Sequence, residues 1–161
     1  MKFLTSLLLA FCLMITAGCI KEKDDSESQA MINVSNAYSF ATLPGMATGA
    51  GFMVIENLAQ QDDTLISVSS PVAEINEIHQ NHLDPDDGTM MMRRLTSVDV
   101  PAGEKVDFDP KGYHIMMIKL KEPLTIGRNV PVTLSFKNAG DILVDMTVIS
   151  PGTTLDHAGH H

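Results

Sequence analysis

Short runs of apolar and β-branched residues, each closed by a turn signal, follow one another from about Val34 to Ser150. Such runs predict β-strands, and clusters of Pro, Gly, Asn and Asp between them predict turns. No long segment has the periodicity of an amphipathic helix. The expected strands are 51–56, 65–69, 74–80, 90–93, 105–108, 114–119, 130–136 and 142–149. Seven to eight strands at this spacing predict a single all-β domain over residues 34–150, a Greek-key β-sandwich of the immunoglobulin or cupredoxin type.

The first residues follow a different pattern. Lys2 precedes an apolar run from Phe3 to Ile15, and small residues then lead to Cys19. This pattern predicts a secretory signal over residues 1–18. The apolar run is too short to predict a membrane span. Ala17-Gly18-Cys19 resembles the lipobox of bacterial lipoproteins, which implies a lipidated Cys19; ordinary signal cleavage is the alternative. We therefore expect an exported, periplasmic or cell-envelope protein that meets the membrane only through a lipid anchor.

The segments that flank the expected domain are polar. Residues 19–33 are charged and lack aromatic side chains until the domain begins, which predicts a flexible tether. Residues 151–161 have no core-forming pattern and are expected to form a disordered tail. His157, His160 and His161 in this tail are candidates for an accessory site, which would suit Cu(II) better than Cu(I) because all three ligands are imidazoles.

Composition narrows the classes of function. The formal net charge is −9, and removal of the expected signal leaves 10 basic against 20 acidic residues, which argues against nucleic acid as a partner. Both cysteines, Cys12 and Cys19, lie near the N-terminus, so the body can form neither an internal disulfide nor a thiolate metal site. Methionine is frequent, with nine of its eleven residues beyond the expected signal.

Methionine and histidine occur together in positions that favour soft metal ions. His114 and Met116 lie two residues apart on an expected strand, so they share a face with Cα atoms about 6.6 Å apart. Ile118 and Leu120 continue that face, which predicts that the pair lies where a core face reaches the rim. Met90, Met91 and Met92 follow an acidic turn, and His79 ends an expected strand just before that turn. Thioethers bind Cu(I) well and hard cations poorly.

The same segments resemble the periplasmic copper chaperones called PCuAC. The resemblance covers about Val34 to Ile149 and rests on Glu77-Ile-His79, Gly88-Thr-Met-Met-Met-Arg93, Val100-Pro-Ala-Gly103 and Gly112-Tyr-His-Ile-Met116. As in the family pattern, 21 residues separate Met92 from His114 and one separates His114 from Met116. The loop from His79 to Met92 is one residue longer than usual, so His82 remains an alternative to His79.

The resemblance implies a cupredoxin-like fold and a Cu(I) site formed by His79, Met92, His114 and Met116. It implies a carrier that delivers copper to a protein such as a cytochrome c oxidase subunit or a Sco-type protein. We expect a monomer and not an enzyme, because the body offers only three histidines and no nucleophile–base signature. Met90, Met91 and His82 are candidates for an accessory role, although we expect His82 to lie in a turn. Buffering of copper, and a lipoprotein that binds no metal, remain alternative functions.

Overall fold

A computed structural model describes residues 31–153 of the chain, and these residues form ten β-strands and no helix. The strands are β1 (Ile32–Phe40), β2 (Thr48–Asn57), β3 (Asp63–Ser69), β4 (Ala73–Leu83), β5 (Met90–Leu95), β6 (Val98–Val100), β7 (Lys105–Phe108), β8 (Tyr113–Leu120), β9 (Asn129–Phe136) and β10 (Gly140–Ile149). The predicted all-β class is therefore confirmed.

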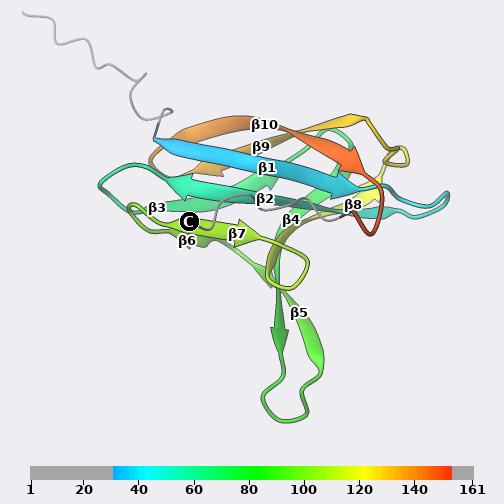
Figure 1. Cartoon of the computed structure of the whole chain (residues 1–161), viewed down its shortest axis with the longest axis horizontal. Helices are drawn as coiled ribbons and strands as arrows, with labels where there is room; N and C mark the ends of the chain where they lie inside the picture. The colour runs from blue at the N-terminus through cyan, green and yellow to red at the C-terminus, as the bar shows by residue number, and fades with distance from the viewer. Residues whose placement is uncertain (1–30, 154–161) are drawn as a thin grey trace, which may run out of the picture.

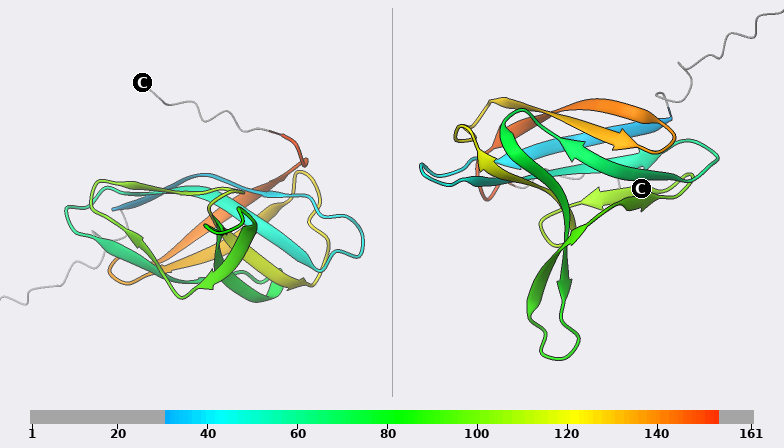
Figure 2. Two further views of the ribbon diagram at one scale, coloured as in Figure 1. Left: turned by 90° about the horizontal axis from the view of Figure 1, so that it is seen from below. Right: turned by 180° about the vertical axis from the view of Figure 1, so that it is seen from behind.

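All ten strands belong to one hydrogen-bonded sheet, in the order β5-β4-β8-β7-β2-β1-β10-β9-β3-β6, with β8 also paired to β2. The sheet curls so that its two halves enclose a single core (Figures 1 and 2). Most pairs are antiparallel, while β1 runs parallel to β10 and β7 runs parallel to β8. Strand β5 lies at one end of this order, which leaves its outer edge without a partner strand in the described part of the chain.

The core follows from the alternation of side chains along each strand. In β9, Val130, Val132, Leu134 and Phe136 point inward and are almost completely buried, while the residues between them are not. Met146 and Val148 of β10 pack into the same cluster, together with Ile55, Leu65 and Met117 from other strands. This core holds the strands that carry the chemistry in fixed register.

Two strands were not predicted, and their sequences explain why. Strand β1 contains polar residues with low β propensity and is irregular at Asn36, whose φ is +52°, so its apolar pattern is broken. Its register with β2 shifts between Ser35 and Tyr38. Strand β6 has three residues, too few for a pattern of alternation to emerge. Because β1 begins at Ile32, the sheet includes the last two residues that were assigned to the tether.

Strand β4 extends three residues beyond its predicted end at Gln80 and forms a hairpin with β5. The pairing of β4 with β8 ends at Gln80 and Tyr113, so the outer part of the hairpin projects from the body as a two-stranded ribbon (Figures 1 and 2). The expectation that His82 lies in a turn is wrong, because His82 is a strand residue paired with Met91. The acidic turn is present between Leu83 and Met90, where Gly88 takes a φ of +73°.

Several predictions concern residues outside the described range. They are the signal over residues 1–18, the lipidation of Cys19, most of the tether, and the tail histidines His157, His160 and His161. Among the described residues, no helix has the length and apolar character needed to cross a membrane.

Candidate metal centre

His79 and His114 lie directly opposite each other on the neighbouring strands β4 and β8. Their ring centroids are 5.8 Å apart. A metal bound at about 2 Å from an imidazole nitrogen lies about 3 Å from the ring centroid, so the separation of the two rings is compatible with one shared ion. Met92 of β5 and Met116 of β8 lie on the same face as the two histidines, because residues two apart and direct cross-strand partners share a face.

This face is opposite to the core face of the strand, which corrects the sequence expectation. Ile115 and Met117 are the residues of β8 that point into the core, with exposures of 1% and 0%. Ile118, which was expected to continue a core face from His114 and Met116, is only partly buried. Leu120, expected on the same face, instead packs against the core, beyond an irregularity at Lys119, whose φ is +56°. The site therefore lies on the outer face of the sheet, at the base of the projecting hairpin.

His114 is nevertheless buried, with 3% of its surface exposed. Its Nδ1 lies 3.2 Å from the carbonyl oxygen of Gly112, which leaves Nε2 available to a metal. Burial lowers the pKa of His114, and His79 adds to this effect against the opposing hydrogen bond to Gly112. A neutral imidazole with one nitrogen held by a backbone carbonyl has the form that metal-binding histidines usually take.

The turn before β8 fixes that carbonyl. Asp109 accepts hydrogen bonds through Oδ1 from the backbone N–H groups of Lys111 and Gly112, at 2.6 and 2.8 Å. The backbone N–H of Asn81 in β4 donates to the Gly112 carbonyl at 3.0 Å, and the Asn81 side chain donates to the Pro110 carbonyl at 2.9 Å. The turn is therefore attached to the hairpin, and the orientation of His114 depends on both.

His79 is held by a carboxylate. Its Nε2 lies 2.8 Å from Oε2 of Glu77, and Oε1 of Glu77 lies 3.3 Å from Nε of Arg94. The Nδ1 atom of His79 is buried and has no hydrogen-bond partner within residues 31–153. Buried polar atoms are rarely left unpaired. A carboxylate on one ring nitrogen and an unpaired second nitrogen together form the arrangement in which a carboxylate orients a metal-binding histidine.

The two methionines complete the set from either side. Met92 pairs with Asn81, two residues from His79, and 53% of its surface is exposed. Met116 pairs with Glu77, also two residues from His79, and is partly buried. Each sulfur is carried on a flexible side chain within diagonal reach of His79, and Met116 also lies two residues from His114 on the same strand. The donor set of two imidazoles and two thioethers suits a soft ion such as Cu(I).

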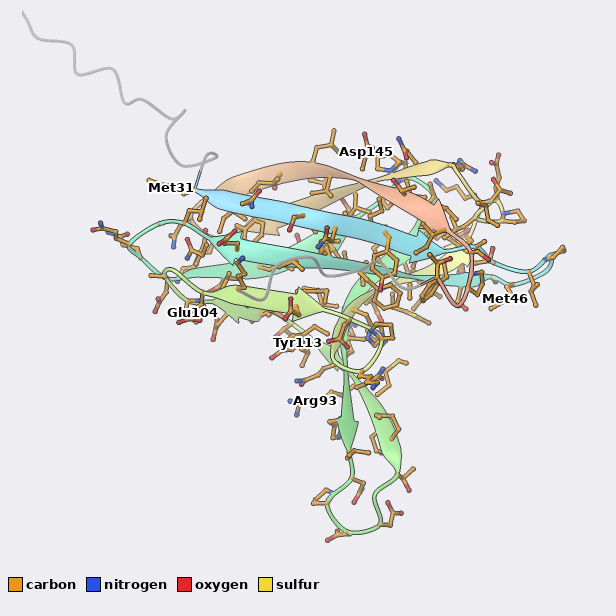
Figure 3. All side chains as sticks on the ribbon, viewed as in Figure 1. Met31, Met46, Arg93, Glu104, Tyr113 and Asp145 are labelled. Carbon is orange, nitrogen blue, oxygen red and sulfur yellow. The ribbon has the colours of Figure 1, made fainter. Side chains whose placement is uncertain are left out.

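The accessory candidates divide between the two faces of the hairpin. Met90 lies on the same face as Met92, one pair further from the body, opposite Leu83. Met91 and His82 lie opposite each other on the other face. His82 therefore does not join His79 and His114, and the geometry favours His79 as the first ligand. Arg93, next to Met92, and Tyr113, next to His114, mark this region in Figure 3.

Glu77, Gly112 and Asn81 are the residues to which the sequence analysis gave no role at the site. The signal for Glu77 was present, because a carboxylate two residues before His79 on a strand must share its face. The Gly112 carbonyl contacts the His114 ring two residues away, and it also accepts the backbone N–H of Asn81. The second contact joins segments distant in sequence, so no local pattern predicts it.

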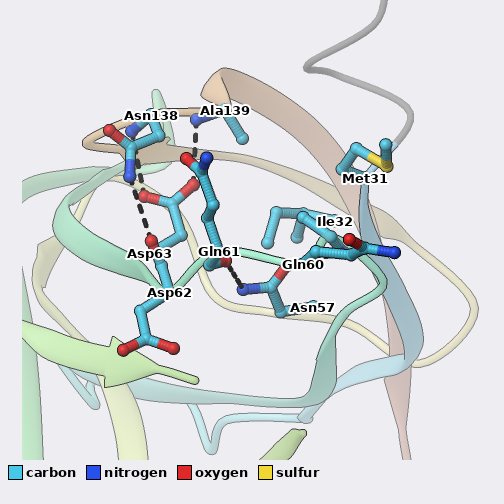
Figure 4. A pocket seen from close by; sticks show the side chains of 10 residues that line it. Met31, Ile32, Asn57, Gln60, Gln61, Asp62, Asp63, Asn138 and Ala139 are labelled. Carbon is cyan, nitrogen blue, oxygen red and sulfur yellow. Dashed lines mark hydrogen bonds between the residues drawn. The ribbon is translucent and has the colours of Figure 1, made fainter. Parts of the chain in front are cut away.

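A pocket of about 490 Å³ lies elsewhere, between the start of β1, the end of β2 and the β9–β10 turn (Figure 4). Two of its polar side chains, Asn57 and Asp63, are already engaged. Asn57 donates to the carbonyls of Gln61 and Val100, at 2.8 and 2.9 Å, and the Asp63 carboxylate accepts backbone N–H groups of Asn138 and Ala139, both at 2.9 Å. These contacts close the loops at this end of the fold and offer no ligand set for a metal.

Comparison with solved structures identifies the fold. The copper-bound PCuAC domain from PmoF2 superimposes with a TM-score of 0.63 and 23% identity, over 75% of this chain and 94% of that domain. The solution structure of CuI-DR1885 from Deinococcus radiodurans gives 0.58 and 24% identity, over 73% of this chain and 77% of that one. The resemblance to PCuAC proteins is therefore confirmed at the level of the fold.

Sequence comparison identifies the family. A protein of Leifsonia xyli subsp. xyli named "Putative lipoprotein" is 28% identical over 107 residues, and the match covers 66% of this chain and 63% of that protein's length. The family model described as "Putative lipoprotein LpqE-like" matches residues 32–148, which is nearly all of the described fold. The chain is a member of the LpqE-like family, with the fold of a PCuAC domain.

Proposed function

We propose that this protein binds one Cu(I) ion through His79, Met92, His114 and Met116, and acts as a carrier of copper outside the cytoplasm. The observation that carries the proposal is the opposed pair of histidines. Each ring has one nitrogen engaged, by Glu77 in one case and by Gly112 in the other, and one nitrogen available. The similar domains from PmoF2 and DR1885 are described as copper-bound and CuI-bound.

Exposure of the ligands favours exchange of the ion over permanent retention. His114 is buried, whereas half of the Met92 surface is exposed on a strand at the end of the sheet. An acceptor can therefore approach from the methionine side and replace the thioethers one at a time, while the histidines still hold the ion. Such a site suits a chaperone better than an enzyme, because all four donors are used to bind and none is left for chemistry on a substrate.

The recipient and the location are part of the same proposal. We propose delivery to an extracytoplasmic copper protein, with the copper centre of cytochrome c oxidase or a Sco-type protein as the first choice. The family and its Leifsonia relative carry lipoprotein names, which supports attachment to the cell envelope through Cys19. Loss of acyl labelling in a Cys19→Ser variant of the expressed gene checks the anchor, and labelling that persists contradicts it.

Competition for Cu(I) with a chromogenic chelator, under reducing conditions without oxygen, tests the proposal. The unmodified protein is expected to withdraw one Cu(I) from the chelator. The Met92→Leu/Met116→Leu variant removes both thioethers at nearly constant volume, and we expect its affinity to fall by at least a hundredfold.

Met31→Leu is the matched control, because Met31 is also exposed, at 43%, and lies away from the hairpin (Figure 3). It is expected to bind like the unmodified protein. Equal affinity of the double variant and the unmodified protein would refute the ligand set.

A further inference from the structure

The reverse face of the β4–β5 hairpin carries a second pairing of imidazole with thioether. His82 and Met91 are direct cross-strand partners on this face, three residues along β4 from His79 and one along β5 from Met92. Side chains that pair in this way have Cβ atoms about 5 Å apart. The ribbon places this pair on the opposite side from the site described above, so the two pairs share no side chain.

The imidazole of His82 is available for binding. Its Nδ1 is buried and lacks a hydrogen-bond partner among the residues that the structure describes, like Nδ1 of His79. Only one other side-chain atom in the described range, Oδ1 of Asn76, is in this condition. A buried nitrogen without a partner is costly, and a bound ion would satisfy it.

The His82–Met91 pair is accessible to solvent through Met91, and a neighbouring pair of side chains holds the two strands together on the side toward the body. Met91 is 45% exposed. Toward the body, Oε1 of Gln80 accepts hydrogen bonds from Nε and Nη2 of Arg93, at 3.2 and 2.8 Å, which ties the two strands together beside the pair. No carboxylate is paired across the strands with either residue, so the cross-strand pair itself consists of a soft donor and an imidazole.

We propose that His82 and Met91 form a second, weaker Cu(I) site on the reverse face of the hairpin. The choice of ion rests on the proposed function, whereas the residues are separate from it. With two protein ligands in place of four, this site holds the ion less tightly and releases it more readily. Because β5 is the end strand of the described sheet, the edge beside Met91 and Met92 is not covered by another strand of residues 31–153.

Silver titration followed by NMR tests this site. Ag(I) is a redox-stable substitute for Cu(I), and the methyl resonance of each methionine reports binding at its own sulfur. The full chain with His114→Ala, Met92→Leu and Met116→Leu removes the first site. In this background the Met91 methyl is expected to shift and saturate, and His82→Ala is expected to weaken that response at least tenfold.

Met90→Leu is the matched control, because Met90 is similarly exposed, at 54%, and points to the other face. It is expected to leave the Met91 response unchanged. A Met91 methyl that does not move, or that moves equally after His82→Ala, overturns the proposal. As a second measurement, the ring resonances of His82 are expected to shift with Ag(I), and to lose that shift after Met91→Leu.

Titration of the unmodified chain separates this inference from the proposed function. There the methyls of Met92 and Met116 report the first site independently of Met91. If those two fail to respond, the proposed function is wrong whatever Met91 does. If they respond and Met91 stays silent at silver excess in both proteins, only the second site is wrong.

Discussion

Replacement of Glu77 by Gln tests whether the carboxylate, and not only the four ligands, sets copper affinity. Glu77 binds Nε2 of His79 at 2.8 Å, and side-chain exposures of 17% and 14% shield this contact from water. Glutamine has the same length and can still accept a hydrogen bond, so the change removes charge with little change in shape. The ring of His79 becomes less basic and less firmly oriented.

The size of the effect follows from the role of such partners in metal sites. Removal of a group that orients a metal-binding histidine typically costs 10- to 100-fold in affinity, or about 1.4 to 2.8 kcal/mol. The charge-neutral Gln retains one hydrogen bond, so we expect the Cu(I) affinity to fall by about tenfold. Glu77→Ala, which removes the contact completely, is expected to approach a hundredfold.

Chelator competition measures this change, and Glu74→Gln provides the control. Glu74 lies on the same strand and also contacts a cation, with Oε2 at 3.0 Å from Nζ of Lys119, but it contacts neither histidine. Its replacement is expected to leave the affinity unchanged. The reasoning is refuted if Glu77→Gln binds as tightly as the unmodified protein, or if Glu74→Gln weakens binding to the same extent.

Three further predictions address stability, protonation and release. Leu134→Ala creates a cavity in the core and is expected to lower the free energy of unfolding by about 2–5 kcal/mol in denaturant titrations, with one Cu(I) still bound below the unfolding transition. Burial lowers the pKa of His114 below 6.5, so the unfolded chain takes up the proton first as the pH falls. The metal-free protein is therefore expected to lose stability below about pH 6.5, and His114→Asn to lose that component; identical pH slopes would contradict this. Met116→Leu is expected to release Cu(I) faster than the unmodified protein in stopped-flow chelator assays, and its melting temperature is expected to stay close to that of the unmodified protein. An unchanged rate of release together with a much lower melting temperature would contradict this prediction.

The sequence predicts the regular strands of this fold well, because their side chains alternate clearly. β9 alternates buried and partly exposed residues along almost its whole length. β1 was not predicted because its polar residues and the irregularity between Ser35 and Tyr38 break its apolar pattern, and β6 was not predicted because three residues are too few to show a period. Both strands are defined in the structure by pairing with neighbouring strands, which no local pattern shows.

The candidate site was predictable as a set of residues but not as an arrangement. Spacing alone placed His114 and Met116 on one face of the strand. Whether that face is the core face or the outer face is decided by the alternate residues Ile115 and Met117, which occupy the core. Strand β8 is apolar on both sides, with Ile118 continuing one face and Met117 the other, so hydrophobicity could not show which side is the core. His82 was assigned to a turn because the length of β4 is set by its pairing with β5, which lies beyond the reach of a local pattern.

X-ray absorption at the copper K-edge of the Cu(I)-loaded full chain tests the central claim most directly, because it counts the atoms bound to the ion. We predict a first shell of two nitrogens and two sulfurs in the unmodified protein, and loss of the sulfur contribution in the Met92→Leu/Met116→Leu variant. A shell of nitrogen and oxygen alone, or a sulfur contribution that survives both substitutions, would contradict the assignment of this face as the copper site.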